Sequence, residues 1–386
     1  MTIYYYNLWN YAPKGYPVRH RHRDPFPPPV IVPDDFTERA RRIRTLDLEL
    51  SRFVLSENDL QNLVIDAFTS NVHWSTKLEG NPLPEGEVRR ITASTLTGKT
   101  KSKETNPGPR QEIINHVSSL VAPNEFRLPW EHVHIKALNS YLLRGTSDDK
   151  ERGLYKTEQN AVYTTLGAEN FIPAPPEYVE QDMQTLLDWV NGPGRAFDSI
   201  VSATIFFHEF ESIHPFMEGN GRTGRCLFHL LLQNSDLPNS HLCKIDKCLL
   251  EEGELYYQLL AYADESGSYT QLIDFISRAL LKSYEAAYQT FREKDTLELD
   301  EDSKRLFEIG KRNGEWFSLG EASHWVEGIG QQTIRNKLNY LAKIGALEKR
   351  GKTQSCRYRV KNPLSKVAGL AKRLHQSTIS LNGDKH

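Results

Sequence analysis

Residues 214–225 read HPFMEGNGRTGR and combine an imidazole, a carboxylate, a glycine-rich turn and two arginines within twelve residues. Gly219 and Gly221 can adopt backbone conformations closed to most residues, so successive amide groups can point into one concavity. The residues that follow are apolar at helical spacing, which predicts a helix beginning at this turn. Because free N–H groups and the helix dipole favour an anion at a helix N-terminus, the stretch predicts a phosphate-binding turn.

The side chains of the same stretch suit a nucleotide. Arg222 and Arg225 lie three positions apart on one helix face, from which each can bind a separate phosphate through forked hydrogen bonds. Glu218 is the kind of hard oxygen ligand that the Mg²⁺ of a nucleotide uses. His214, which ordinarily titrates near neutrality, is the predicted general base. The alternative is a glycine-rich turn before an ordinary core helix, but the base, the acid and both arginines in register favour a functional site.

This stretch resembles the signature of the Fic family, His-x-Phe-x-(Asp/Glu)-Gly-Asn-Gly-Arg-x-x-Arg, at every specified position. The resemblance implies transfer of AMP from ATP, with Mg²⁺ as cofactor, to a hydroxyl side chain (Ser, Thr or Tyr) of a protein, itself included. It implies that His214 is the base, that Glu218 binds the metal ion and that Phe216 is buried. The α-phosphate is expected on Asn220 and the loop amides, and the β- and γ-phosphates on the arginines. The expected nucleotide-binding residues of this stretch are Gly219, Asn220, Gly221, Arg222, Thr223, Gly224 and Arg225.

A second motif lies at the end of a helix predicted over about 57–79. Residues 75–81 read STKLEGN and resemble the Ser/Thr-x-x-x-Glu-Gly/Asn motif of self-inhibited Fic proteins that carry the inhibitory helix before the Fic core. The resemblance implies that Glu79 binds Arg225 in place of the γ-phosphate, so that ATP binds with its α-phosphate misoriented. The alternative is an exposed glutamate before a Gly-Asn helix stop.

Composition indicates a multidomain protein without a membrane partner. The 386 residues suggest two or three domains, and the net charge of −2 gives no overall attraction to nucleic acid or membrane. No apolar run approaches the roughly 20 residues of a membrane span, and the N-terminus lacks the order of a signal peptide. Cys243 and Cys248 are the only close cysteine pair, and His241 beside them allows a metal site, but reduced structural thiols are favoured. His20 and His22 could also bind a metal ion, but a solvated charged strip is favoured there. We expect a cytoplasmic protein.

The predicted fold is mainly α, with a helical Fic-type core, a β-hairpin flap and a C-terminal winged-helix (helix-turn-helix) domain. The expected segments are an extended Pro-rich arm (1–34), an N-terminal helical region with the inhibitory motif (35–128), the Fic catalytic core (129–291), and the winged-helix domain with a basic tail (292–386). Ala93–Thr100 resembles a degenerate P-loop but lacks a preceding apolar strand, and we expect a solvated loop there.

Within the core we expect helices over 131–143, 180–190 and 200–213. Alternation around a turn at 167–170 predicts a β-hairpin within residues 153–176. In Fic proteins the corresponding hairpin is a flap that binds a target segment as an added strand, so a protein target is expected to dock there; a plain surface hairpin is the alternative.

His208 and Tyr256 of the core each have either a packing role or a role at the nucleotide. His208 is expected to be a packing histidine. Tyr256 is expected at the adenine, although a core tyrosine is equally open.

The C-terminal segment changes character after a charged stretch, 292–304, that is predicted to be a linker. Three helices, the second over about 318–325 and the third over 331–344, then a strand-like run at 356–360, predict a winged helix with a two-stranded wing. Between Arg335 and Arg373 stand twelve Lys or Arg residues and one acid.

Arg335, Lys337 and Asn339 are predicted to face a DNA major groove, and a protein-binding role is equally open. The alternatives to AMP transfer are therefore a DNA-binding regulator whose Fic body senses nucleotide, and an enzyme that removes AMP. The protein could also form a homodimer, which the sequence leaves open.

Overall fold

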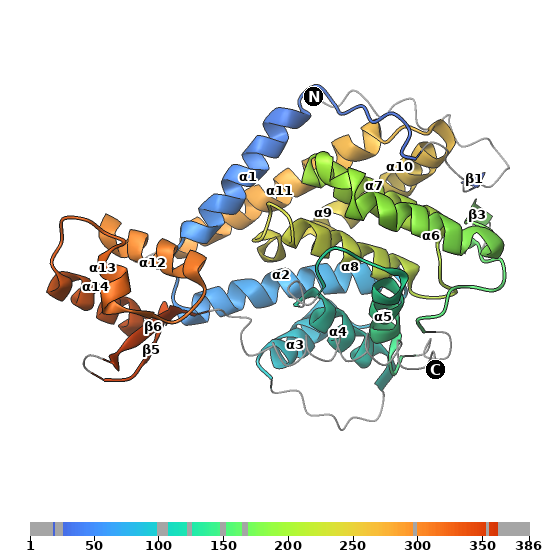
Figure 1. Ribbon diagram of the computed structural model, residues 1–386. Helices are drawn as coiled ribbons and strands as arrows, with labels where there is room; N and C mark the ends of the chain where they lie inside the picture. Colours follow the sequence, from blue (N-terminus) through green and yellow to red (C-terminus); the bar gives the residue numbers. More distant parts are fainter. Residues whose placement is uncertain are drawn as a thin grey trace, which may run out of the picture.

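The computed structural model describes residues 18–19, 26–98, 107–121, 126–146, 152–163, 169–295, 299–352 and 355–361. These residues form a mainly helical fold with two small three-stranded sheets (Figure 1). The helices are α1 (Phe36–Arg52), α2 (Glu57–Leu78), α3 (Glu85–Leu96), α4 (Pro107–Leu120), α5 (His132–Leu143), α6 (Pro176–Asn191), α7 (Ser199–Ile213), α8 (Asn220–Gln233), α9 (Ile245–Leu250), α10 (Gly253–Ser266), α11 (Thr270–Lys294), α12 (Glu301–Asn313), α13 (Leu319–Ser323) and α14 (Gln331–Lys343), with short 3₁₀ helices at Pro193–Ala196 and Ser240–Leu242. The strands are β1 (Val18–Arg19), β2 (Val162–Tyr163), β3 (Glu169–Ile172), β4 (Phe317–Ser318), β5 (Leu347–Arg350) and β6 (Arg357–Val360).

One apolar core joins the helices from α1 to α11. Its buried side chains run from Phe36 to Phe291, and those of α1 recur every three or four residues, as a helix packed on one face requires. Figure 1 shows α1 lying along α11. The expected N-terminal helical region and catalytic core therefore pack around the same interior.

The helix pair α7–α8 is central to this core. All residues of α8 and most of α7 are buried, and the two helices pack against each other. The predicted nucleotide loop connects them, so its two ends are fixed by two buried helices.

The predicted hairpin is present as β2 and β3, which pair antiparallel. The N-terminal arm contributes β1, which pairs parallel with β3 through Val18 and Arg19 opposite Phe171 and Ile172. The strand order is therefore β1-β3-β2, a third strand that the sequence did not predict. Gly167 and Ala168 of the expected turn lie outside the described residues, whereas Glu169 and Asn170 belong to β3.

The C-terminal residues form a second, smaller unit (orange to red in Figure 1) with its own apolar core. α12, α13 and α14 pack against a sheet of order β4-β6-β5 in which both pairings are antiparallel. The unit touches the body at the start of α2, where Lys361 forms an ion pair with Glu57.

Three sequence-based predictions require correction. The charged stretch 292–304 is mostly helical, because α11 continues to Lys294 and α12 begins at Glu301. Ala93–Leu96 belong to α3, where Leu96 is buried, and not to a solvated loop; Lys99 and Thr100 lie outside the described residues. The C-terminal sheet has three strands because Phe317 and Ser318 pair with β6. The tail beyond residue 361 also lies outside the described residues.

A buried polar cluster fixes α7 to α10 and α11. His208 contacts Glu209 through Nδ1 at 2.8 Å and the Leu260 carbonyl through Nε2 at 3.1 Å, with the Asp264 carboxylate 3.5 Å from Nε2. Tyr269 donates a 2.8 Å hydrogen bond to Glu209. Burial opposes protonation of His208, but the two carboxylates outweigh it and raise its pKa to about 10. The expected packing histidine is therefore buried with partners, and it carries charge.

No helix among the described residues is long and apolar enough to cross a bilayer. The described residues also contain no cluster of three or more His, Cys, Asp or Glu side chains that could hold a metal ion. Cys243 is buried and Cys248 is half-buried, and neither forms a disulfide.

The shared core predicts unequal effects of two truncations on α1. Ile43 is fully buried, so Ile43→Ala should lower the free energy of unfolding by about 3 kcal/mol. Leu48, 43% exposed on the same helix, is the matched control, and Leu48→Ala should cost less than about 1 kcal/mol. Urea denaturation measures both values, and equal values would show that α1 does not belong to the core.

The His208 cluster predicts a pH-dependent stability. Because the folded pKa of about 10 lies above the ordinary value of 6.5, this stabilisation is complete below about pH 6.5 and is lost as the pH rises toward 10. Urea midpoints of the wild type should therefore fall more steeply between pH 7 and 9.5 than those of His208→Gln. Parallel pH profiles of the two proteins would contradict a charged His208.

Candidate nucleotide site

The loop between α7 and α8 is held by its own backbone and by one amide side chain. His214 ends α7 in the left-handed region, with φ 50°, and Gly219 precedes α8 with φ 77°. Asn220 accepts a 2.8 Å hydrogen bond from the Phe216 N–H and donates one of 2.7 Å to the Phe216 carbonyl. Phe216 is fully buried, as the resemblance implied. In this structure the Asn220 side chain therefore braces the loop.

Neighbouring elements hold the loop from outside. Asn139 of α5 donates to the Glu218 carbonyl at 3.0 Å and to Thr223 Oγ1 at 3.3 Å. Lys156 donates through Nζ to the Ile213 carbonyl and to Asn160, and its backbone N–H donates to the Pro215 carbonyl. These positioning residues were missed in the sequence, because nothing in their local pattern marks them.

The surroundings of His214 favour a neutral imidazole that can act as a general base. Its Nδ1 lies 3.2 Å from the Glu211 carbonyl, which can only accept, so Nδ1 carries the proton and Nε2 is the basic atom. Burial, and then the charge of Lys156, lower the pKa of His214 to about 4. The expectation of titration near neutrality is therefore wrong, because it ignored burial. Burial also lowers the pKa of Lys156 to about 7.

Arg225 binds the residues of the second motif. Its Nε donates to Ser75 Oγ at 2.8 Å, and its Nη2 donates to the Ser75 carbonyl at 3.0 Å and to the Glu79 carboxylate at 2.7 Å. The arginine is buried, whereas the Glu79 side chain is 25% exposed. Burial opposes ionisation of Glu79, but Arg225, followed by Arg222, outweighs it and lowers the pKa of this carboxyl.

The Glu79 carboxylate also lies against the N-terminus of α8. A Cβ atom at Gly221 would collide with Glu79 Oε1 and would lie 2.8 Å from Arg225 Nη1. The carboxylate thus occupies the point where the helix dipole, the amides of the turn and a guanidinium all favour an anion.

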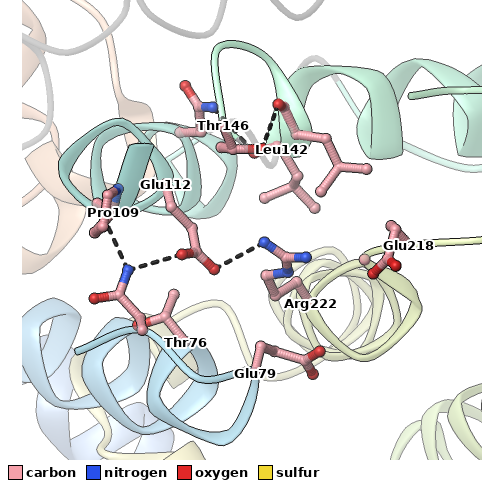
Figure 2. Close-up of polar contacts among 12 residues, drawn as sticks. Thr76, Glu79, Pro109, Glu112, Leu142, Thr146, Glu218 and Arg222 are labelled. Carbon is pink, nitrogen blue, oxygen red and sulfur yellow. Dashed lines mark hydrogen bonds and ion pairs between the residues drawn. The ribbon is translucent and has the colours of Figure 1, made fainter. Parts of the chain in front are cut away.

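Arg222 turns toward α4. Its Nη1 donates a 2.8 Å hydrogen bond to Glu112, whose other carboxylate oxygen accepts one of 2.7 Å from Asn81 (Figure 2). Burial raises the pKa of Glu112, although Arg222 and Asn81 act in the opposite direction. Nothing in the local sequence pattern marks Glu112.

Most of the predicted site residues line one cleft of about 620 Å³. Those that line it are Glu79, His214, Glu218, Asn220, Gly221, Arg225 and Tyr256. Glu211 lines it as well, and burial raises the pKa of its carboxyl to about 7. Tyr257, 37% exposed, lines the cleft beside the buried Tyr256.

The other predicted residues serve the loop itself. Gly219 lies where a Cβ would press on Leu143, at 2.8 Å. Thr223 donates to the Gly219 carbonyl, and a Cβ at Gly224 would collide with Glu211.

The residues proposed for a DNA groove are partly engaged within their own unit. Lys337 forms ion pairs with Asp300 and Asp302. Asn339 accepts hydrogen bonds from Lys349 and Tyr358. Arg335 is exposed.

Residues 129–232 match the Fic/DOC family model. Similar proteins include protein adenylyltransferase fic-1 of Caenorhabditis briggsae and of Caenorhabditis elegans, each 31% identical over 186 residues, which is 46% of this chain and 34% of the relative. Protein adenylyltransferase Fic of Nematostella vectensis is 22% identical over 233 residues, 59% of this chain and 50% of the relative. The chain therefore spans a third to a half of the length of these relatives.

The fold is similar to the crystal structure of a Fic family protein from Desulfovibrio desulfuricans G20. The TM-score is 0.57 at 23% sequence identity, and the match covers 87% of this chain and 98% of that chain. The mainly helical arrangement is therefore Fic-like. Residues 129–232 therefore resemble the Fic/DOC family, and part of the chain is distantly similar to protein adenylyltransferases.

Proposed function

We propose that this protein transfers AMP from ATP to a hydroxyl side chain of a protein and that Glu79 restrains the reaction. The observation that carries the proposal is the position of the Glu79 carboxylate, against Gly221 and on Arg225, in a cleft that also holds His214. An anion site and a neutral imidazole in one cleft are what phosphoryl-type transfer requires.

The proposed reaction is a displacement at the α-phosphorus. The hydroxyl oxygen of the target forms a bond to this phosphorus, and the bond to the bridging oxygen of the β-phosphate breaks, so that pyrophosphate leaves. Nε2 of His214 accepts the hydroxyl proton. The Glu211 carbonyl holds Nδ1 and so fixes the tautomer and the direction of Nε2.

The remaining groups of the cleft bind the nucleotide. The N-terminus of α8 and Arg225 are assigned to the phosphates, and Tyr256 and Tyr257 to the base. Glu218 is an exposed carboxylate that lines this cleft, and it would hold a hard divalent cation such as Mg²⁺. A Mg²⁺ ion held there supplies charge neutralisation for the phosphates.

Glu79 restrains the reaction by occupying the position of a phosphate. The buried guanidinium of Arg225 pairs either with this carboxylate or with the terminal phosphate, since both need the same donors. With Glu79 in place, ATP binds with its α-phosphate turned away from His214. The resting protein is therefore expected to have low activity.

The hairpin β2–β3 is the proposed dock for the protein target. β3 is already paired on both edges, with β2 on one side and Val18–Arg19 on the other. A target segment that pairs directly with β3 must therefore displace the arm strand.

Radiolabelled ATP with Mg²⁺ tests the proposal. Glu79→Gly removes the competing carboxylate and should raise incorporation of AMP into protein by on the order of tenfold or more. Glu79→Gln, which keeps the shape but loses the charge, should give a similar gain. His214→Ala in the Glu79→Gly background should reduce incorporation about 10²- to 10⁴-fold, because the base is lost.

Other results point to other functions. Release of free AMP from a premodified protein by the wild type, lost in Glu79→Gly, would identify a de-AMPylating enzyme. Absence of label in every variant, together with salt-dependent DNA binding that Arg335→Ala weakens, would favour a regulator with a DNA-binding winged helix.

The pH dependence of the rate tests the role of His214. Because its pKa is about 4, the base is already neutral at pH 5.5, and kcat of Glu79→Gly at saturating Mg-ATP should change less than about twofold between pH 5.5 and 7.5. A base with the ordinary pKa of 6.5 would instead lose about tenfold at pH 5.5. Such a loss would show that His214 does not have this lowered pKa in the active protein.

A further inference from the structure

The proposed function leaves Glu112 of α4 without a role, although this carboxylate holds one of the two signature arginines. Glu112 and Arg222 are both buried, and their ion pair is 2.8 Å long. Such a pair, taken out of water, is strong only when its remaining polar atoms are also satisfied. Asn81 meets this condition for Glu112, because it donates a 2.7 Å hydrogen bond to the second carboxylate oxygen.

Asn81 links this pair to the second motif. It stands two positions after Glu79, and its backbone N–H donates to the Thr76 carbonyl in the last turn of α2. Its side-chain amide also donates to the Pro109 carbonyl, and its oxygen accepts from the Leu83 N–H. Asn81 therefore connects the turn that carries Glu79 to α4, and the same side chain hydrogen-bonds Glu112.

Each of the two signature arginines thus forms an ion pair with a glutamate from another helix region. Arg225 lines the cleft and is bound to Glu79, whereas Arg222 is directed at Glu112 and is absent from the residues that line the cleft. Figure 2 shows the Arg222 guanidinium pointing toward α4 and the Glu218 side chain on the other side of the α8 turn. To reach a phosphate in the cleft, Arg222 must exchange the Glu112 carboxylate for the phosphate oxygens.

We propose that Glu112 is a positioning residue that holds Arg222 away from the nucleotide and, through Asn81, fixes the turn that carries Glu79. The inference rests on the proposed function and adds that Arg222, once released from Glu112, joins Arg225 at the phosphates of ATP. The two restraints share the short segment Glu79–Asn81, so loss of Glu112 or of Asn81 weakens both. Repulsion between the carboxylates of Glu79 and Glu112, which contributes to the raised pKa of Glu112, is offset only while each has its arginine.

Glu112→Gln tests the proposal because it keeps the size of the side chain and removes its charge. Calorimetric titration of the full chain with Mg-ATP should show affinity about fivefold or more tighter than in the wild type. The gain should persist in the Glu79→Gly background, since Arg222 is released in both. Label incorporation without Glu79→Gly should also rise, because the Glu79 turn is loosened.

Asn81→Ala is the second variant, and it changes no charge. It removes the hydrogen bond that fixes Glu112 and should shift Mg-ATP affinity in the same direction by a smaller factor. Glu38→Gln, which removes an exposed carboxylate paired with Arg41, is the matched control and should leave affinity unchanged. Thermal melting of each variant reports whether it is folded, so Asn81→Ala carries the test if Glu112→Gln does not fold.

The possible results separate the two proposals. Unchanged Mg-ATP affinity in both variants would overturn the inference and leave Glu112 as a structural ion pair. Weaker affinity would also overturn it, because Glu112 would then present Arg222 to the phosphate. If Glu79→Gly transfers no label, the proposed function fails, whereas the affinity measurement still decides whether Glu112 restrains Arg222.

Discussion

The buried guanidinium of Arg225 requires an anion, and this requirement organises the site. A cation removed from water is stable only with a carboxylate or a phosphate beside it. Ser75 supplies neutral acceptors, and Glu79 supplies the charge. The N-terminus of α8 at Gly221 also favours an anion at this position, because its amides and the helix dipole attract negative charge. One position therefore suits either an internal carboxylate or the phosphate of a nucleotide, and in the proposed mechanism the two compete.

The shared core brings Glu79 to Arg225. Glu79 and Arg225 are 146 residues apart in the chain, and they meet because α2 and α8 pack into the same interior. The exposed end of α2, in contrast, is a single turn that Asn81 fastens to α4. Release of Glu79 thus needs movement of a short surface turn, while the helices that position His214 and the phosphate site stay packed.

Local sequence predicted the parts of the site whose geometry is local. The spacing within 214–225 was sufficient for the glycine turn, the helix after it and the buried Phe216, because all are set by neighbours in the chain. The pKa of His214 was not predictable, since it depends on burial and on Lys156 from a distant segment. Glu112 was missed for the same reason: α4 has no distinctive motif, and only the fold brings it to Arg222. The arm strand was missed because a two-residue pairing leaves no periodic signal.

The central claim is that Glu79 occupies the position of a phosphate. A crystal structure of Glu79→Gly with Mg-ATP tests it most directly. The terminal phosphate should lie within hydrogen-bond distance of the Arg225 guanidinium, and the α-phosphate should face His214. A nucleotide bound with its phosphates away from Arg225 and Gly221 would contradict the account.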